Sequence, residues 1–509
     1  MKSINRREYF KISLAGSALL AIPPILNSCK VSQNKIVLNS PLVSAQNGGC
    51  LISSLSPINQ TISADIVIAG GSTGGCAAAL AAARMGQRVI LVEETDWIGG
   101  QLTSQGVPPD ENPWIETTGC THLYRTYRNN VREYYKQHFP LSNKALNAKY
   151  LDPGNGGVSP LCHDPRVAVS VLNQMLAPYI ISGKIMLFLN HQIIDVVVNE
   201  DKIESFIFKN SKSGNTLTAK APYFIDATEL GDVLPLGNIE YVTGAESRSE
   251  TGEPHAVEGP AQPLNMQAIS HCFALSYYPG ENHIIEKPRD YDFWRDYQPQ
   301  MTPPWPGKQL AWCLSDAVTL APRETSVFQK RENGTIGGLF YFRRIADMKN
   351  FEPGFLDSDV TLVNWPMMDY WLKPIIGLSP EDTAVAIEEA RQLSLSLIYW
   401  MQTECPRHDG KGKGYPGLKL RKDVFGTENG LAKYPYIRES RRIKAEFTIL
   451  EQHVASELDP RENFATPFRD SCGIGWYRID LHPSTGGNNY IDIGALPFQI
   501  PLGALIPKR

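Results

Sequence analysis

Residues 64–94 constrain the fold of this chain more than any other stretch, because two short apolar runs flank a glycine-rich turn and an alanine-rich segment. The run 65–69 predicts a parallel strand that is buried on both faces, and 88–92 predicts its neighbour. Between them, the small residues of 76–85 predict a helix that approaches the sheet closely. This order indicates a βαβ unit of the kind that binds dinucleotides.

The turn between the first strand and the helix predicts a phosphate site. Gly70 permits a tight turn, and small residues as far as Gly75 let a pyrophosphate approach the free amides at the helix N-terminus. Serine replaces the middle glycine of the usual three-glycine fingerprint. A glycine-rich turn without a ligand is the alternative interpretation. The cofactor-binding residues predicted here are Gly70, Gly71, Ser72, Gly74 and Gly75.

The residues after the second strand indicate which dinucleotide binds. Glu93 follows that strand, where a carboxylate accepts hydrogen bonds from ribose hydroxyls and disfavours the 2′-phosphate of NADP. Segment 97–106 resembles the part of glutathione-reductase and fumarate-reductase type flavoproteins that passes the flavin ring, which favours FAD over NAD. Its paired glycines allow close backbone approach and its polar residues offer hydrogen bonds, although an ordinary polar loop is the alternative. The predicted contacts are Gly99, Gly100, Gln101 and Thr103.

Five blocks farther along the chain carry a resemblance to one family. They read HDPRVA at 163–168, YFIDATELGD at 223–232, RESRR at 438–442, GIGWYRIDLH at 473–482 and IPLGALIP at 500–507. With the first unit, they resemble the large bacterial FAD-dependent oxidoreductase family, some members of which are labelled xanthan lyase. The resemblance implies an α/β fold: a Rossmann-like FAD-binding domain of the GR2 type with an inserted α+β substrate or cap domain. It also implies that FAD is the cofactor and that Asp226, Thr228 and Gly231 lie at its adenine end.

Members of that family usually continue beyond a block like 500–507 with a strand, a glycine-containing turn and a helix that complete the flavin site. This chain ends at Arg509. We therefore expect the usual C-terminal flavin-binding segment to be missing, and whether FAD still binds without it stays open.

The expected organisation has seven parts. They are a signal with a possible lipidation box (1–29), a polar linker (30–62), an FAD-binding βαβ unit (63–110), a helical insertion (111–160), a second part of the FAD-binding domain (161–245), a substrate or cap domain (246–485) and a return to the FAD domain (486–509). Further helices are expected at 118–139, 165–181, 380–401 and 438–457.

The amino terminus predicts export. Basic residues, among them Arg6 and Arg7, precede the apolar run 12–26, which is short for a membrane span and typical of a secretory signal. The paired arginines resemble a twin-arginine signal, whose pathway exports folded proteins. Ser28 and Cys29 resemble a lipoprotein cleavage box, so a lipid anchor on Cys29 is one possibility. We expect a periplasmic protein or one tethered to the outer side of the inner membrane.

Composition limits the partners and metals. The net charge of −4 gives no general attraction to nucleic acid. The 9 cysteines include no CxxC pair, so we expect no metal centre held by a local motif.

The sequence is least informative about catalysis. A flavin performs the hydride chemistry, and the protein binds the substrate and supplies a base or a charge clamp. His482, beside Asp480, is a candidate acid or base. Arg438 and Arg441, near the start of the expected 438–457 helix, are candidates for binding an acidic substrate, with a structural salt-bridge cluster as the alternative.

The most specific prediction is an exported FAD-dependent oxidoreductase. It takes hydride from a C–H bond of a small organic or sugar-derived substrate, and the electron acceptor is unknown. An NAD-dependent redox enzyme and a non-catalytic or truncated binding lipoprotein with a flavoprotein fold are the alternatives. The substrate and the oligomeric state stay open.

Overall fold

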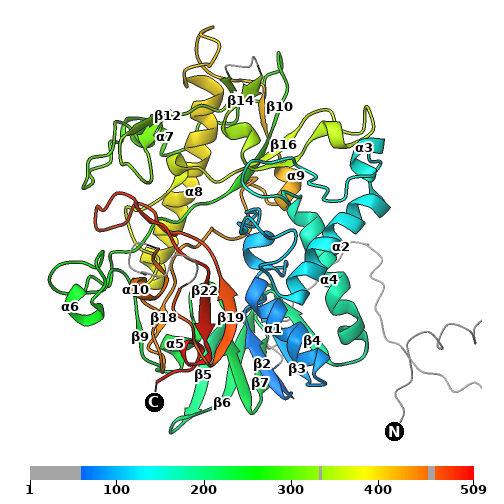
Figure 1. Ribbon diagram of the computed structural model, residues 1–509, viewed down its shortest axis with the longest axis vertical. Coiled ribbons are helices and arrows are strands. Elements are labelled where there is room, and N and C mark those ends of the chain that lie inside the picture. Colours follow the sequence, from blue (N-terminus) through cyan, green and yellow to red (C-terminus); the bar gives the residue numbers. More distant parts are fainter. Residues whose placement is uncertain (1–58, 332–334, 457–464, 509) are drawn as a thin grey trace, which may run out of the picture. The chain divides into compact units, whose positions relative to one another are not determined.

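The computed structural model describes residues 59–331, 335–456 and 465–508. Figure 1 shows the arrangement of the helices and strands within that part of the chain. The expected signal, most of the polar linker and Cys29 lie outside the described residues.

The first predicted unit forms the centre of a parallel sheet. Strands β2 (Ile66–Ala69) and β3 (Val89–Glu93) pair in parallel, with β4 (Ile185–Leu189) beyond β3 and β8 (Tyr223–Asp226) beyond β2. All of β3 and most of β2 are buried, as the apolar runs predict. This sheet confirms the predicted Rossmann-like α/β fold.

Alternate residues of the central strands face two different layers. Ile68 and Leu91 pack with the helices α1 (Thr73–Arg84), α2 (His122–His138) and α4 (Pro165–Ile181). Val67 and Ile90 pack on the opposite side, against a second sheet. That sheet has the order β1-β7-β6-β5, from Asn59–Ser63, Thr216–Lys220, Lys202–Asn210 and His191–Asn199. The helices expected at 118–139 and 165–181 are therefore confirmed, and both cover the same face of the parallel sheet.

A third sheet lies in the region expected to be the cap. It is antiparallel, in the order β15 (Arg344–Ala346), β16 (Val360–Val363), β10 (Phe273–Tyr277) and β17 (Leu418–Leu420). The long helix α8 (Pro380–Thr403) contacts β17 and confirms the helix expected at 380–401. Its neighbours form an aromatic core that includes Trp294, Trp365 and Tyr370. In Figure 1 α8 stands beside this sheet.

The remaining elements are short. The other strands are β9 (Tyr241–Val242), β11 (Cys313–Ser315), β12 (Pro322–Glu324), β13 (Gln329–Lys330), β14 (Ile336–Gly337), β18 (Arg442–Ile443), β19 (Ser471–Gly475), β20 (Ile479–Leu481), β21 (Ile491–Ile493) and β22 (Phe498–Pro501). The other helices are α3 (Asn143–Leu146), α5 (Val233–Leu236), α6 (Arg248–Thr251), α7 (Tyr291–Asp296), α9 (Lys422–Phe425) and α10 (Glu451–Val454), with 3-10 turns at Gly100–Leu102, Leu339–Tyr341, Met348–Asn350, Pro366–Met368 and Leu502–Leu505.

The helix expected at 438–457 is wrong. Residues 438–441 have no regular structure, Arg442 opens β18, and only Glu451–Val454 is helical. The arginines instead bond to distant segments: Arg438 to the backbone oxygen of Ala268, Arg441 to Asp232 and Arg442 to Glu246. Tertiary contacts of these side chains thus override the helical propensity of the segment.

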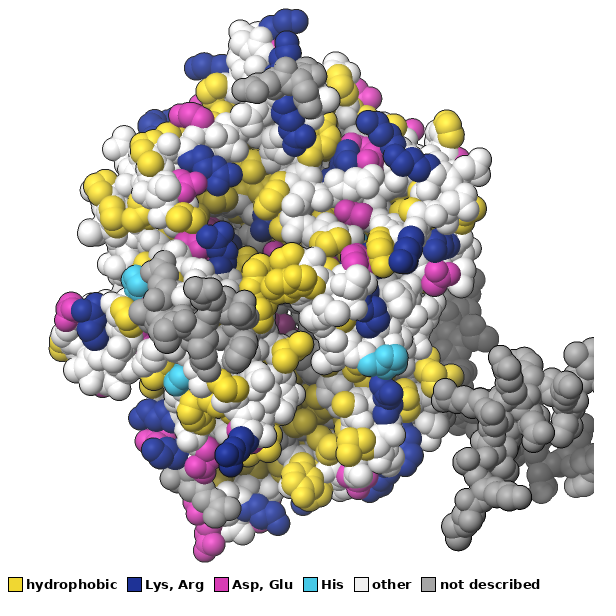
Figure 2. Space-filling model, in the orientation of Figure 1, with side chains coloured by type: hydrophobic (Ala, Val, Ile, Leu, Met, Phe, Trp, Pro, Cys, Tyr) yellow, Lys and Arg dark blue, Asp and Glu magenta, His cyan; other side chains and the backbone are white. Residues whose placement is uncertain are grey.

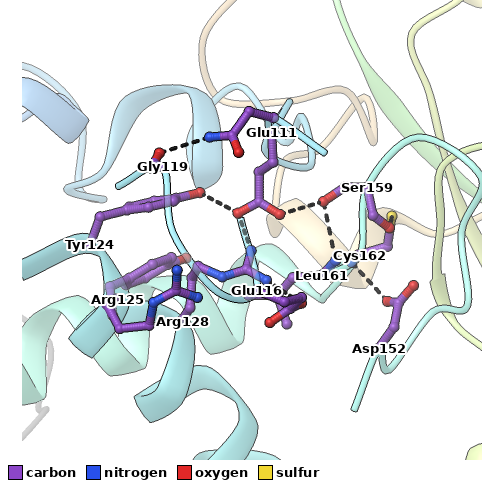
Figure 3. A network of polar contacts seen from close by, with 12 residues as sticks. Glu111, Glu116, Gly119, Tyr124, Arg125, Arg128, Asp152, Ser159, Leu161 and Cys162 are labelled. Carbon is purple, nitrogen blue, oxygen red and sulfur yellow. Dashed lines mark hydrogen bonds and ion pairs between the residues drawn. The ribbon is translucent and has the colours of Figure 1, made fainter. Parts of the chain in front are cut away.

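A buried ionic network fixes the loop that precedes α2. Figure 3 shows Tyr124, Arg128 and Ser159 pointing toward the carboxylate of Glu111. Arg128 also donates to Glu116, and its side chain is fully buried. Because breaking a buried pair leaves an uncompensated charge, this network holds residues 111–116 in one place.

Among the described residues, no helix is both long and apolar enough to cross a membrane. Over the same residues, no group of three or more His, Cys, Asp or Glu side chains is placed to hold a metal ion.

Candidate functional site

The glycine-rich turn adopts a conformation that only glycine accepts readily at its start. Gly70 has a φ of 95°, and a Cβ there would overlap the backbone of Ala227 after β8. A Cβ on Gly75 would overlap the backbone oxygen of Gly70. A Cβ on Gly74, in contrast, would meet only the Ser72 side chain, at 3.7 Å. Gly70 and Gly75 therefore allow the turn to close, while the side of the turn at Gly74 stays open.

The serine in the middle of the fingerprint has a structural role. Ser72 is the N-cap of α1, and its side-chain oxygen accepts a hydrogen bond from the amide of Gly75 at 3.2 Å. Its φ of −58° needs no glycine. The first amides of α1 have no acceptor within the helix, and the first turn carries no acidic residue, so this end of the helix suits a phosphate.

Glu93 is held at the edge of the turn. One carboxylate oxygen accepts from the amide of Gly71 at 2.8 Å, and the other accepts from the amide and hydroxyl of Thr95. The residue is 7% exposed, and burial raises the pKa of its carboxyl group although these hydrogen bonds lower it. An ionised carboxylate has about four acceptor positions, so one is left for the predicted ribose hydroxyl.

The predicted flavin loop is built by its backbone. Gly99 and Gly100 have φ values of 110° and 51°, which favour glycine. Thr103, predicted to contact the flavin, is buried and donates its hydroxyl hydrogen to the backbone oxygen of Ile98 at 2.6 Å. Gln101 follows Gly100 in the 3-10 turn and is partly exposed.

The turn after β8 is also internally bonded. Asp226 accepts hydrogen bonds from the amide and hydroxyl of Thr228 and from the amide of Val233. Gly231 has a φ of 67°. These three predicted residues, Asp226, Thr228 and Gly231, therefore shape the turn that meets the glycine-rich loop.

A narrow groove runs along this junction, and acidic side chains that the sequence prediction missed line it. Glu94, Glu229 and Asp232 border it together with Ser72 and Glu93. Burial, with the nearby charge of Glu93, raises the pKa of Glu94 to about 8 and that of Glu229 to about 7. Because protonated carboxyl groups carry no charge, this shift reduces the repulsion that a pyrophosphate would meet. The turn and the helix end thus offer the groups that bind a phosphate, while the groove between these carboxyl groups has a volume of about 20 Å³.

A second polar cluster gathers around Asp369. The Asp369 carboxylate is fully buried and accepts from Nδ1 of His482 at 2.6 Å, from Arg438 at 2.9 Å and from the Ser270 hydroxyl at 2.6 Å. Burial raises the pKa of Asp369, but Arg438 and His482 lower it further than that, so the carboxylate is ionised. The structure therefore unites two of the three predicted catalytic residues, through an aspartate that carried no recognisable sequence pattern.

The third residue lies elsewhere. Arg441 donates to Asp232 at 3.0 Å and to the backbone oxygen of Leu230 at 2.8 Å, so it braces the turn after β8. Arg438 is 8% exposed and also donates to the Ala268 backbone oxygen and the Ser270 hydroxyl. Most of its donors are occupied. The predicted catalytic and cofactor roles of all these residues stay predictions.

Of two cavities with similar volumes that the described residues form, one borders the Asp369 cluster. This cavity, of about 570 Å³, is bordered by His482, Arg438 and the apolar side chains of Leu481 and Ile491. The other, of about 560 Å³, is bordered by Asp110, Trp114 and Trp476. Figure 2 shows hydrophobic side chains gathered around hollows in the middle of the visible face. The cluster thus has open space beside it for a small molecule.

Similar proteins are found by family and by structure. A family model described as FAD dependent oxidoreductase matches residues 65–509. The chain is similar to a myxobacterial FAD-dependent halogenase at 18% identity and a TM-score of 0.23, which covers 43% of this chain and 45% of that one. It is similar to quinol fumarate reductase of E. coli at 16% identity and a TM-score of 0.23, over 37% and 34% of the two chains. A flavin-dependent monooxygenase solved with FAD and substrate shares 14% identity at a TM-score of 0.24, over 42% and 35%.

The chain thus spans less than half the length of each of these solved proteins. No curated protein matches. The family match extends over the parallel sheet, the glycine-rich turn and the Asp369 cluster. The protein is therefore a member of the FAD dependent oxidoreductase family, an enzyme whose cofactor is FAD.

Proposed function

We propose that this enzyme oxidises a C–H bond of a small organic or sugar-derived substrate by hydride transfer to the flavin, outside the cytoplasm. One observation carries the proposal: His482, whose Nδ1 lies 2.6 Å from the buried Asp369 carboxylate, lines a cavity of about 570 Å³. Bound FAD supplies the hydride acceptor. The protein then has to bind the substrate and accept a proton.

His482 has the environment of a proton acceptor. Since Asp369 is ionised, Nδ1 of His482 donates to it, and Nε2 is left to accept a proton from a substrate hydroxyl. Burial and Arg438 lower the pKa of His482, but Asp369 and Asp480 raise it by more, so the net shift is upward. Asp480 lies 3.7 Å from Nε2 and stabilises the imidazolium that results.

Arg438 supports this pair by positioning Asp369. Its guanidinium lies 2.9 Å from the Asp369 carboxylate, and both groups are almost fully buried. The carboxylate is thereby held in the orientation that His482 requires.

Flavin reduction tests the proposal. The purified enzyme, loaded with FAD and kept free of oxygen, is mixed with small hydroxylated substrates while absorption near ~450 nm is followed. Bleaching by one of them, slowed about 100-fold or more in His482→Gln, is the expected result. The exposed His122 provides the control, and His122→Gln should bleach like the wild type. Equal rates in wild type and His482→Gln would remove His482 from the reaction, and a yellow protein that no substrate bleaches would favour a binding role.

Export and lipidation belong to the same proposal. They are supported by Arg6, Arg7, the apolar run 12–26 and Cys29. Fractionation of cells that express the full chain should place it beyond the inner membrane. Replacement of both arginines by lysine should keep it in the cytoplasm, and Cys29→Ser should release it from the membrane if a lipid anchors it.

A further inference from the structure

Two adjacent carboxylates in one loop have opposite surroundings. Glu111 is bound by Tyr124, Arg128 and Ser159, and its side chain is 1% exposed. Asp110 borders the 560 Å³ cavity, and within the described residues its carboxylate forms neither a hydrogen bond nor an ion pair. The network around Glu111 (Figure 3) thus fixes the loop and leaves Asp110 available at the cavity.

Two adjacent arginines show the same contrast. Arg344 pairs with Asp359 at 2.7 Å and with Asp347 at 2.8 Å. Arg343 pairs with no carboxylate of the described chain, and its Nε is buried without a partner. Over the part of the chain that the structure describes, its one side-chain hydrogen bond goes from Nη1 to the backbone oxygen of Asn364, at 2.7 Å. A partly buried guanidinium with so few partners lowers the folding stability unless an anion pairs with it.

Arg343 and Asp110 lie beside the Asp369 cluster. Asn364 accepts from Arg343 through its backbone oxygen and from Arg438 through its side chain, at 3.4 Å, so the two arginines are neighbours. Asp369 neutralises Arg438, whereas among the described residues no carboxylate pairs with Arg343. Burial raises the pKa of Asp110, and Arg343 is the cation that lowers it most, so these two groups lie within electrostatic reach without touching.

We infer that Arg343 and Asp110 form the substrate-recognition site, and that the substrate is a small organic acid that also bears a hydroxyl group. A substrate carboxylate accepts hydrogen bonds from the free edge of Arg343, while a substrate hydroxyl donates to Asp110. One ligand thereby gives both Arg343 and Asp110 a hydrogen-bond partner. This inference rests on the proposed function, because Arg438, which pairs with Asp369 beside His482, also acts electrostatically on Asp110. Both a simple hydroxy acid and a sugar acid have the required chemistry.

Calorimetric titration, in the absence of oxygen, of the full chain loaded with chemically reduced FAD tests the assignment without turnover, because reduced flavin accepts no hydride. Four probes form two matched pairs: lactate against propionate, which lacks the hydroxyl, and glucuronate against glucose, which lacks the carboxylate. The wild type should bind lactate or glucuronate, and the preferred one distinguishes a simple hydroxy acid from a sugar acid. Arg343→Gln should weaken that binding about 10- to 100-fold, because a hydrogen bond to a charged group contributes about 1.5–3 kcal/mol. Asp110→Asn should reduce the preference for lactate over propionate, and the exposed Arg84→Gln serves as the control.

Thermal unfolding separates recognition from a structural role. Arg343→Gln should leave the Tm of the ligand-free enzyme unchanged or higher, since it removes an unpaired charge, whereas Arg344→Gln should lower it. The bound acid should raise the Tm of the wild type but not of Arg343→Gln. Equal affinities of wild type and Arg343→Gln for both acids, or no acid binding by the wild type, would overturn the assignment. Flavin bleaching by a neutral substrate alone would also overturn it while leaving the proposed oxidoreductase function intact.

Discussion

The dinucleotide groove and the Asp369 cluster are built in opposite ways. Main-chain geometry forms most of the groove: the turn at Gly70 and Gly75, the N-terminus of α1 and the left-handed residues Gly99 and Gly100. Side chains from distant segments form the cluster, in which Ser270, Arg438 and His482 all converge on Asp369.

This difference determines how each region responds to mutation. In the groove an added methyl group is the damaging change, because backbone atoms occupy the space. In the cluster a lost charge is the damaging change, because every buried ion depends on its partner. Mutations in one region should therefore spare the function of the other.

The largest effect is expected at Gly70. Gly70→Ala places a Cβ against the backbone of Ala227 at a φ of 95°, so it should cost about 4 kcal/mol of folding stability and abolish FAD binding. Gly74→Ala, in the same turn, meets only a contact at 3.7 Å and should keep the Tm within a few degrees. Thermal unfolding of both variants checks this, and equal Tm values would refute the backbone account of the groove.

The next effect is expected at Asp369. Asp369→Asn leaves Arg438 as a buried charge without its carboxylate and should cost about 3 kcal/mol in urea unfolding. The Asp480 side chain is 24% exposed and lies 3.7 Å from His482. Asp480→Asn should therefore lower the free energy of unfolding by about 1 kcal/mol or less. If the two variants unfold at the same urea concentration, Asp369 is not the centre of the cluster.

A smaller, pH-dependent effect is expected in the groove. The pKa of Glu229 is raised to about 7 in the folded protein, so folding stability falls as pH rises from the unfolded value near 4.5 through 7. Glu229→Gln should therefore stabilise the protein by about 2 kcal/mol at pH 8 and by little at pH 4.5. Unfolding at both pH values gives the comparison, and a stabilisation that does not depend on pH would count against the shifted carboxyl group.

The same direction of pH dependence, with the smallest effect, is expected in the cluster. The folded pKa of His482 is raised, so its pairing with Asp369 stabilises the protein fully below the unfolded pKa near 6.5 and this gain is lost as pH rises through the folded pKa. His482→Gln should lower the free energy of unfolding by about 1 kcal/mol at pH 6 and by less at pH 9. A cost that grows with pH would show that His482 is held neutral.

The same contrast explains what the sequence could predict. Residues 65–94 are contiguous, so strand, turn, helix and acid could be recognised in order, and Glu93 indeed contacts Gly71. Asp369 could not be found, because its partner His482 is 113 positions away and nothing around Asp369 forms a motif. The 438–457 helix was wrong for a related reason: Arg438 and Arg441 are fixed by distant partners that no local pattern reveals.

The predicted roles of single residues depend on side-chain direction, which spacing does not give. Thr103 bonds within its own loop, and Arg441 braces a turn of the FAD-binding region. The domain boundaries expected from the sequence likewise stay predictions.

One measurement tests the separation of groove and cluster most directly: the visible absorption spectrum of the purified full chain after dialysis against FAD. The wild type and His482→Gln should both show flavin bands near ~370 and ~450 nm, while Gly70→Ala should show none. A colourless wild type, or a Gly70→Ala variant as yellow as the wild type, would contradict the account.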